Sequence, residues 1–164
     1  MTTPNTPGSH EEPAPDPGHD AFPPAVLRTA ELPAYERGGG ASTTPLVTTA
    51  VGAQVFLNGI TLFAPGAGIP PHTHNCAESV VILDGCAVVD IDGTEHRLNR
   101  FDTTYVAAGT PHCFRNASTT ETMRILWTYA SVEATRTIVE TGATARIDAE
   151  HAKPARTGNW SRND

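Results

Sequence analysis

Short apolar runs separated by turn residues recur through the middle of the chain. Their spacing is typical of strands rather than helices, and they lie at residues 46–50, 55–63, 79–83, 86–91, 94–98, 103–106, 112–116 and 123–130. Asp84-Gly85 and Asp92-Gly93 separate consecutive runs, and Asp-Gly is favoured in the primed turns of β-hairpins. We therefore predict a three-strand meander over residues 79–98, within an all-β antiparallel sandwich or barrel.

Two segments outside this centre give mixed signals. Asn58-Gly59 lies between apolar residues and is a hairpin signal, so residues 55–63 form either one strand or a hairpin. Residues 131–141 are rich in β-branched side chains, which favour strands, but their apolar positions also recur at near-helical spacing. The type of this second segment stays open.

Residues that bind metals cluster between these runs. His72 and His74 flank a single threonine, and side chains two residues apart on a strand point to the same face. Glu78 follows four residues later, and a turn at residues 75–77 can bring its carboxylate toward the two imidazoles. His112 lies on a later predicted strand and completes the set. Imidazoles combined with a carboxylate are typical ligands of a divalent transition metal.

The spacing of these residues resembles the two sequence motifs of the cupin superfamily. The first motif is matched over residues 66–85, at Gly66, His72, His74, Glu78 and Gly85. The second is matched over residues 101–116 at Gly109, His112 and Asn116. Phe101 stands where this second motif has its first glycine, and Ala107 stands where it has proline. Both departures fall at positions that shape the backbone, and neither falls on a ligand position.

The resemblance implies a jelly-roll barrel, also called a double-stranded β-helix. It favours one long strand over residues 55–63, bent at Gly59 and leading into the first motif. It also implies that one divalent ion is bound by His72, His74, Glu78 and His112. Iron(II) is the favoured metal, and manganese, nickel, cobalt and zinc are alternatives because affinity alone does not choose between them. Four protein ligands on an octahedral ion leave two positions for water, substrate or dioxygen.

These expectations point to a metal-dependent enzyme that acts on a small molecule, foremost an iron(II)-type oxygenase. One alternative is a lyase, isomerase or cyclase in which the metal acts as a Lewis acid without redox chemistry. Another is a non-catalytic module that binds or senses a ligand. Beyond the metal centre, only Glu78 is a candidate catalytic residue. The resemblance further implies a homodimer, with Leu46–Ala50 as an edge strand that needs cover.

Composition limits the remaining possibilities. The chain has 164 residues, enough for one domain, which we place at residues 25–150. Residues 1–24 are rich in proline and acids and residues 151–164 are polar, so we expect a disordered N-terminal tail and a flexible C-terminal tail. A net charge of −7 argues against a nucleic-acid partner. No apolar run reaches membrane-spanning length and no signal peptide is evident, so a cytoplasmic location is expected.

Several other side chains have structural interpretations. The odd count of three cysteines argues against a disulfide framework, and we predict small buried thiols. Tyr105, Phe114 and Trp127 are predicted as core aromatics. Arg115 and Arg124 are predicted to point outward, although either would bind a substrate carboxylate if its strand faced the other way.

Overall fold

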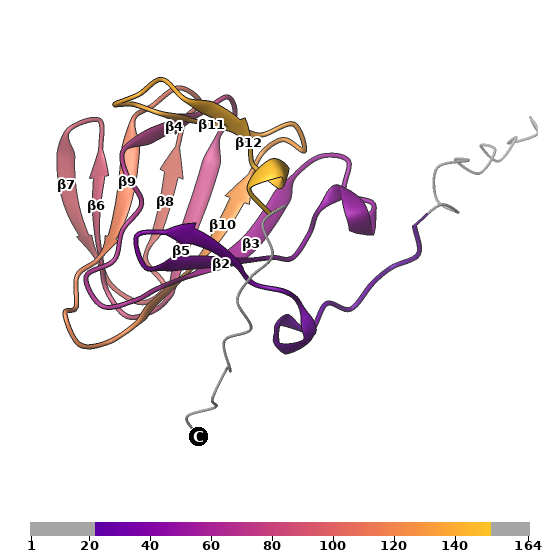
Figure 1. The fold of residues 1–164 in the computed structure, drawn as a ribbon, viewed down its shortest axis with the longest axis horizontal. Coiled ribbons are helices and arrows are strands. Elements are labelled where there is room, and N and C mark those ends of the chain that lie inside the picture. Colours follow the sequence, from indigo (N-terminus) through magenta and orange to yellow (C-terminus); the bar gives the residue numbers. More distant parts are fainter. Residues whose placement is uncertain (1–21, 152–164) are drawn as a thin grey trace, which may run out of the picture.

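The computed structural model describes residues 22–151 as two facing antiparallel sheets of six strands each. The first sheet has the order β1 (Tyr35–Gly38), β2 (Ala41–Pro45), β3 (Leu57–Phe63), β10 (Met123–Tyr129), β5 (Glu78–Asp84) and β8 (Thr103–Val106). The second has the order β12 (Thr144–Arg146), β11 (Thr135–Ile138), β4 (His72–His74), β9 (His112–Asn116), β6 (Ala87–Ile91) and β7 (Thr94–Leu98). Figure 1 shows the two sheets closing into a barrel, with β4 and β11 along its upper side. The predicted all-β jelly-roll fold is confirmed.

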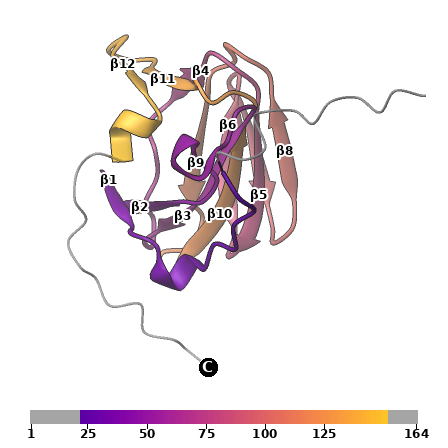
Figure 2. The same ribbon diagram turned by 90° about the vertical axis from the view of Figure 1, so that its right-hand side faces the viewer.

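Helical structure is limited to three short 3₁₀ turns in the described residues. These are η1 (Thr29–Glu31), η2 (Thr49–Val51) and η3 (Asp148–His151). Figure 2 shows η3 beside β1, at the edge of the first sheet. Within residues 22–151 no helix is both long enough and apolar enough to cross a membrane.

The core lies between the two sheets and follows from strand alternation. In β3, β5 and β10 every second residue is buried, so each strand sends one row of side chains inward. The first sheet contributes Phe63, Ile82 and Met123, and the second contributes Val89 and Phe114. Fully burying each such side chain stabilises the fold by about 1.5–3 kcal/mol. This shared interior fixes which face of each strand looks toward the candidate site.

The predicted three-strand meander is wrong at its first turn. β6 and β7 form the expected hairpin across Asp92-Gly93, but β5 pairs with β10 and β8 in the other sheet. The chain therefore crosses from one sheet to the other at Gly85, which has a φ of +77°. A Cβ at Gly85 would lie 2.8 Å from the Thr122 carbonyl oxygen, so only glycine fits this crossing. The Asp-Gly turn signal in the sequence is the same for a hairpin and for a crossing between sheets.

The predictions for the less regular segments have mixed outcomes. β3 is one continuous strand, as the preferred interpretation held, and the Trp127 ring packs over Gly59 where any Cβ would clash. Residues 131–141 contain strand β11. The predicted strand Leu46–Ala50 is wrong, because the strand there is β2, which ends at Pro45 before η2 begins.

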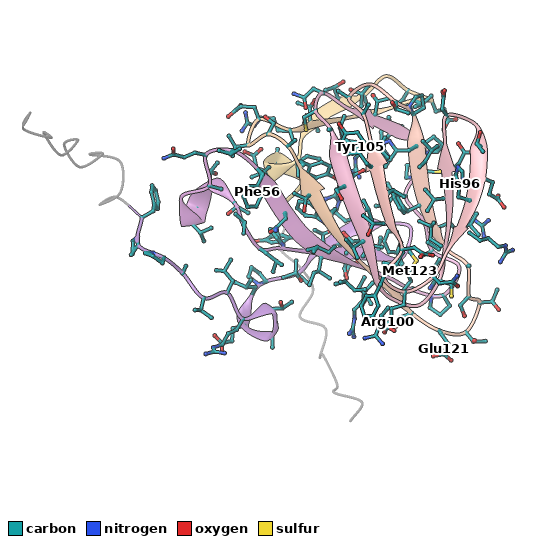
Figure 3. All side chains as sticks on the ribbon, turned by 180° about the vertical axis from the view of Figure 1, so that it is seen from behind. Phe56, His96, Arg100, Tyr105, Glu121 and Met123 are labelled. Carbon is teal, nitrogen blue, oxygen red and sulfur yellow. The ribbon has the colours of Figure 1, made fainter. Side chains whose placement is uncertain are left out.

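Single side chains also differ from prediction. Tyr105 is 75% exposed rather than in the core, because alternation on edge strand β8 turns Thr104 and Val106 inward instead. Figure 3 labels Tyr105 on this strand. Phe114 and Trp127 are buried as predicted. The three cysteines are free thiols, but none is fully buried as predicted. Cys76 and Cys113 are half-buried, and Cys86 is exposed because it lies in the crossing between the sheets.

In the second motif, the departure at Phe101 strains the backbone. Phe101 takes the place of a glycine and has a φ of +72°, a left-handed conformation that is costly for a residue with a Cβ. Its ring is 66% exposed, with the Arg100 guanidinium 4.5 Å from the ring centroid. Figure 3 shows Arg100 at the lower end of the barrel, near Glu121. The strain therefore lies at the end of the barrel away from β4 and β11.

The predicted tails and domain limits are not decided by this structure. Residues 1–21 and 152–164 lie outside the described residues, so the expected disorder at both ends stays a prediction. The homodimer also stays a prediction. The edge strand proposed for it, residues 46–50, is not a strand.

Candidate metal centre

The four predicted ligand residues come from both sheets. His72 and His74 point inward from β4, and the threonine between them does not. His112 on β9 is the direct partner of His72 across the strand pair. Glu78 is the first residue of β5, so the turn at residues 75–77 carries the chain from the second sheet to the first. The barrel interior therefore holds the four side chains between its two walls.

Their ligand atoms are close together. One nitrogen or oxygen from each residue lies within 4.8 Å of the corresponding atoms of the other three, and all four residues are buried. His112 Nε2 and Glu78 Oε2 are 2.8 Å apart, and His74 Nε2 lies 3.8 Å from the same oxygen. Two ligands at about 2.1 Å from one ion can be about 4.2 Å apart at most. Small inward shifts would therefore suffice for all four to bind one ion.

Backbone carbonyls orient all three imidazoles. Nδ1–H of His72 donates to the Pro70 carbonyl oxygen at 2.7 Å, and Nδ1–H of His112 donates to that of Thr110 at 2.9 Å. In each case the acceptor lies two residues earlier and a proline stands between the two residues. Nδ1–H of His74 donates to the Thr135 carbonyl oxygen on β11 at 2.8 Å. Each ring thus presents Nε2 inward, as imidazole ligands of a metal do.

Asn75 fixes the segment whose Thr135 carbonyl accepts the hydrogen bond from His74. Its Nδ2 donates to the Glu133 carbonyl oxygen at 3.0 Å, and its Oδ1 accepts from the Thr135 amide at 2.8 Å. These two bonds fix the segment that supplies the acceptor for His74. The residue directly after the His-x-His pair therefore positions one of its imidazoles.

The pKa values favour neutral imidazoles at two positions. Burial lowers the pKa of His72 to about 2, and the charge of His112 adds to this effect. Burial likewise lowers the pKa of His74, although Glu78 opposes it. Burial also acts on His112, but the hydrogen bond and charge of Glu78 outweigh it and raise the pKa of His112. A bound cation would compete with the proton that Glu78 favours on His112.

One buried atom without a hydrogen-bond partner fits a metal-binding role for these residues. Among the described residues, His74 Nε2 is one of two buried side-chain atoms without a hydrogen-bond partner. A buried polar atom without a partner costs about 1–3 kcal/mol, so such atoms usually mark a ligand, ion or water. Three Nε2 atoms and a carboxylate fit one divalent transition metal. The donor set alone does not decide which one.

A small cavity, with about 20 Å³ of room for water-sized molecules, adjoins these residues. His72 and Glu78 form part of its wall, and the aromatic rings of Phe114, Trp127 and Tyr129 form another part. The Trp127 and Tyr129 ring centroids are 4.9 Å apart, and Tyr129 lies 4.5 Å from the His74 ring. These rings therefore give the cavity an aromatic wall beside the candidate ligand atoms.

Polar groups complete the cavity wall. The hydroxyls of Thr43 and Thr61 are 2.8 Å apart, and the Trp127 indole N–H donates to Thr61 at 3.0 Å. Arg37 on β1 and Arg136 on β11 also line the cavity. These four residues were not predicted from the sequence, and no motif marks them.

The two arginines named in the sequence analysis, Arg115 and Arg124, do not line the cavity. Arg115 and Arg124 are exposed on β9 and β10, as predicted. In each strand the neighbouring buried residues, Phe114 and Ile125, face the cavity instead. The barrel therefore turns Arg115 and Arg124 away from the cavity that Phe114 and Ile125 line.

Comparison with known proteins agrees with the fold and the site. Residues 59–129 match the sequence model of the family described as Cupin domain. Among solved structures, the chain is similar to an RmlC-like cupin from Shewanella frigidimarina, with 17% identity and a TM-score of 0.58 over 69% of this chain and 92% of the other. It is also similar to the polyketide cyclase RemF from Streptomyces resistomycificus, with 19% identity and a TM-score of 0.61 over 75% and 84% of the two chains. At these identities the structural likeness shows the fold alone.

Two curated Streptomyces proteins are similar in sequence. The chain is 31% identical to the tetracenomycin polyketide synthase protein TcmJ of S. glaucescens over 93 residues, which is 56% of this chain and 61% of TcmJ. It is 29% identical to polyketide synthase CurC of S. cyaneus over 103 residues, which is 62% of this chain and 67% of CurC. The match to TcmJ thus spans less than two thirds of that protein's length.

The class follows from these findings together. The protein is a jelly-roll barrel with a buried His, His, Glu, His group that could hold one metal ion. Its residues 59–129 match the Cupin domain model and its fold is similar to that of solved cupins, so the resemblance that the sequence motifs indicated is confirmed.

Proposed function

We propose that the protein is a metal-dependent enzyme that closes rings in a polyketide-type substrate, acting as a cyclase without redox chemistry. The observation that carries the proposal is the sequence similarity to two polyketide synthase proteins, at 31% and 29% identity. This similarity favours the Lewis-acid alternative over the oxygenase that the sequence motifs first indicated.

The cavity chemistry fits such a substrate. Polyketides contain alternating carbonyl groups, and their cyclised products are planar phenols. A metal ion bound at His72, His74, Glu78 and His112 would polarise a carbonyl oxygen and make the adjacent C–H more acidic. The rings of Phe114, Trp127 and Tyr129 would hold the chain in a flat arrangement and exclude water.

Glu78 has a second role in this proposal. Among the described residues that line the cavity, it is the one carboxylate. Its Oε2 already accepts a hydrogen bond from His112 Nε2. We assign to this carboxylate the proton removed from the substrate carbon during ring closure, with His112 as its hydrogen-bonded partner.

The test uses heptane-2,4,6-trione, a small triketone whose ring closure with loss of water gives a resorcinol. Ring closure should be faster with zinc-loaded protein than with metal-free protein, and it should proceed without oxygen. Product formation is followed by liquid chromatography, and oxygen consumption by an electrode. His96→Ala, which changes an exposed histidine on β7, is the matched control.

Two results would contradict the cyclase proposal. One is a rate that is the same with and without metal. The other is turnover that requires both iron(II) and oxygen, which would restore the iron(II)-type oxygenase as the function. In that case phenolic and enolic compounds are the first substrates to screen, because they can bind such a metal directly.

A further inference from the structure

The outer face of the first sheet carries a row of apolar side chains. Ile60 on β3 is the cross-strand partner of Leu126 on β10, and Leu126 is also the partner of Val81 on β5. All three alternate with buried residues, so they point outward, and all three are half-buried. Tyr105 on the neighbouring strand β8 also points outward and is exposed, as Figure 3 shows. These four residues are called the outer patch below.

The second sheet has a different outer face. The residues that point outward from β4, β6 and β9 include Thr73, Asp90 and Arg115. An antiparallel sheet with one face in water normally has apolar side chains inside and polar side chains outside. The second sheet follows this rule, and the first sheet departs from it. Because contiguous apolar patches on a surface often mark a site of association, the outer patch is a candidate interface.

A second apolar surface lies at the N-terminal end of the described chain. Residues 22–28 form no helix or strand, and Figures 1 and 3 show them extending away from the barrel as an arm. Phe22 and Val26 on this arm are exposed, Val26 by 83%. Val55 and Phe56, just before β3, are exposed as well, and Figure 3 places Phe56 on the side from which the arm extends. These four side chains are called the arm patch.

The sequence outside the described residues is unsuited to cover either patch. Residues 1–21 contain no leucine, isoleucine, valine or aromatic residue, and residues 152–164 contain only Trp160 from this group. Apolar surface is stabilised by contact with other apolar surface, so the occupant must supply such side chains. A second copy of this chain does so, because each copy presents both an outer patch and an arm patch.

We propose that the protein forms a two-fold symmetric homodimer in which the arm of each copy lies across the outer patch of the other. Two-fold symmetry makes this contact reciprocal, so one arrangement buries both patches of both copies. Seven extended residues span about 23 Å, whereas the four strands from β3 to β8 are about 14 Å across, so the arm is long enough. This surface differs from the edge strand first expected at residues 46–50, and the inference does not depend on the proposed function.

The test measures the mass of the whole chain by sedimentation velocity over a range of concentrations. Wild-type protein should be mainly dimeric at about 10 μM. Val26→Lys puts a positive charge on the arm patch, and Tyr105→Glu puts a negative charge on the outer patch. Each change leaves a charge without a partner in the interface, so each should raise the dimer dissociation constant at least about 10-fold.

Mixing these two variants shows which surfaces touch. In a mixed dimer, one arm and the patch it covers are unchanged, and at the other contact the new lysine faces the new glutamate. The mixture should therefore form dimers with a dissociation constant within about 3-fold of the wild-type value. An interface of arm against arm, or of outer patch against outer patch, would instead place each new charge beside an unchanged apolar residue and would not recover the dimer.

A matched control separates this interface from a general effect of surface charge. Val139→Lys changes another exposed valine, just after β11 and outside both patches. It should leave the dissociation constant within about 2-fold of the wild-type value. Metal content and melting temperature of every variant show whether the barrel is intact.

Three results would overturn the inference. The first is wild-type protein that stays monomeric at about 100 μM, which would leave the outer patch to a different partner. The second is a dimer that neither single variant weakens. The third is a mixture of the two variants that stays monomeric, since the arm would then not lie on the outer patch. None of these results bears on ring closure, so the proposed function is tested separately.

Discussion

The candidate ligands and the two cavity arginines face one cavity, but they are positioned by different parts of the barrel. The ligand residues lie on β4, β5 and β9, within two short stretches of sequence. Arg37 and Arg136 lie on β1 and β11, about 100 residues apart in the chain. Figure 2 shows β1, β11 and β12 on one side of the barrel, with η3 between them. In this arrangement the central strands carry the candidate ligands, and the flanking strands carry the two arginines of the cavity wall.

Related barrels can therefore differ more readily in their flanking strands than in their central strands. Central strands need fixed spacing because a metal site tolerates little change in ligand geometry. Flanking strands can change a bulge or a single side chain without moving the ligands. One ligand set can therefore serve many substrates.

The largest effect is expected on metal content, which changes at the candidate ligands should lower and changes at the cavity arginines should not. His72→Ala or His112→Ala removes one candidate ligand and should lower metal affinity more than about 100-fold, because the loss exceeds that of a supporting hydrogen bond. Arg37→Ala and Arg136→Ala should keep about one metal per chain. Elemental analysis after dialysis measures both. Full metal content in both histidine variants would show that the ligand assignment is wrong.

A second prediction uses pH to examine the ligand strands without metal. His72 and His74 have lowered pKa values, so below about pH 6.5 the unfolded chain binds protons that the folded protein does not. Stability of the metal-free protein should therefore fall with acidification, by up to about 1.4 kcal/mol per pH unit for each histidine.

His112 makes the opposite contribution to the pH dependence of stability. Its raised pKa stabilises the fold at low pH, and this contribution is lost as pH rises from about 6.5 through the folded-state pKa. Metal-free protein should thus be most stable near pH 6.5. Urea unfolding at a series of pH values measures this, and His72→Asn should make the acid side less steep. An equally steep acid side in that variant would contradict the assignment to His72.

The third prediction concerns the point where the two regions meet. Asn75 follows the ligand strand and fixes residues 133–135, which lead into β11. Asn75→Ala should lower metal affinity by about 10-fold, because the Thr135 carbonyl would no longer hold His74 firmly. Competition with a chromophoric chelator measures the affinity. Asn99→Ala, at an exposed asparagine before β8, should leave it unchanged.

The smallest expected effect lies outside both regions. Phe101→Gly removes a side chain from a left-handed position and should raise the free energy of unfolding by at most about 1 kcal/mol, since lost ring contacts offset part of the gain. Thermal unfolding measures the change, and metal affinity should stay constant. A clear loss of stability would mean that the Arg100–Phe101 contact outweighs the backbone strain.

Local sequence patterns were enough to predict the strand class and the candidate ligand set. Alternation on a strand is a local property, so His72 and His74 had to share a face, and the motif spacing added Glu78 and His112. The long strand through Gly59 was likewise predicted from this resemblance. The proline directly before both His72 and His112 is a sequence signal for their carbonyl partners, Pro70 and Thr110.

Long-range packing, in contrast, sets which strands share a sheet and which side chains reach the cavity. Asp84-Gly85 looks like a hairpin turn, yet the chain crosses between sheets there because β5 pairs with β10, a partner 40 residues away. Arg37 reaches the cavity through a bulge against β2, and Arg136 through pairing of β11 with β4. Tyr105 is exposed because β8 is an edge strand. Each of these outcomes depends on contacts between distant segments, which local propensity and spacing do not encode.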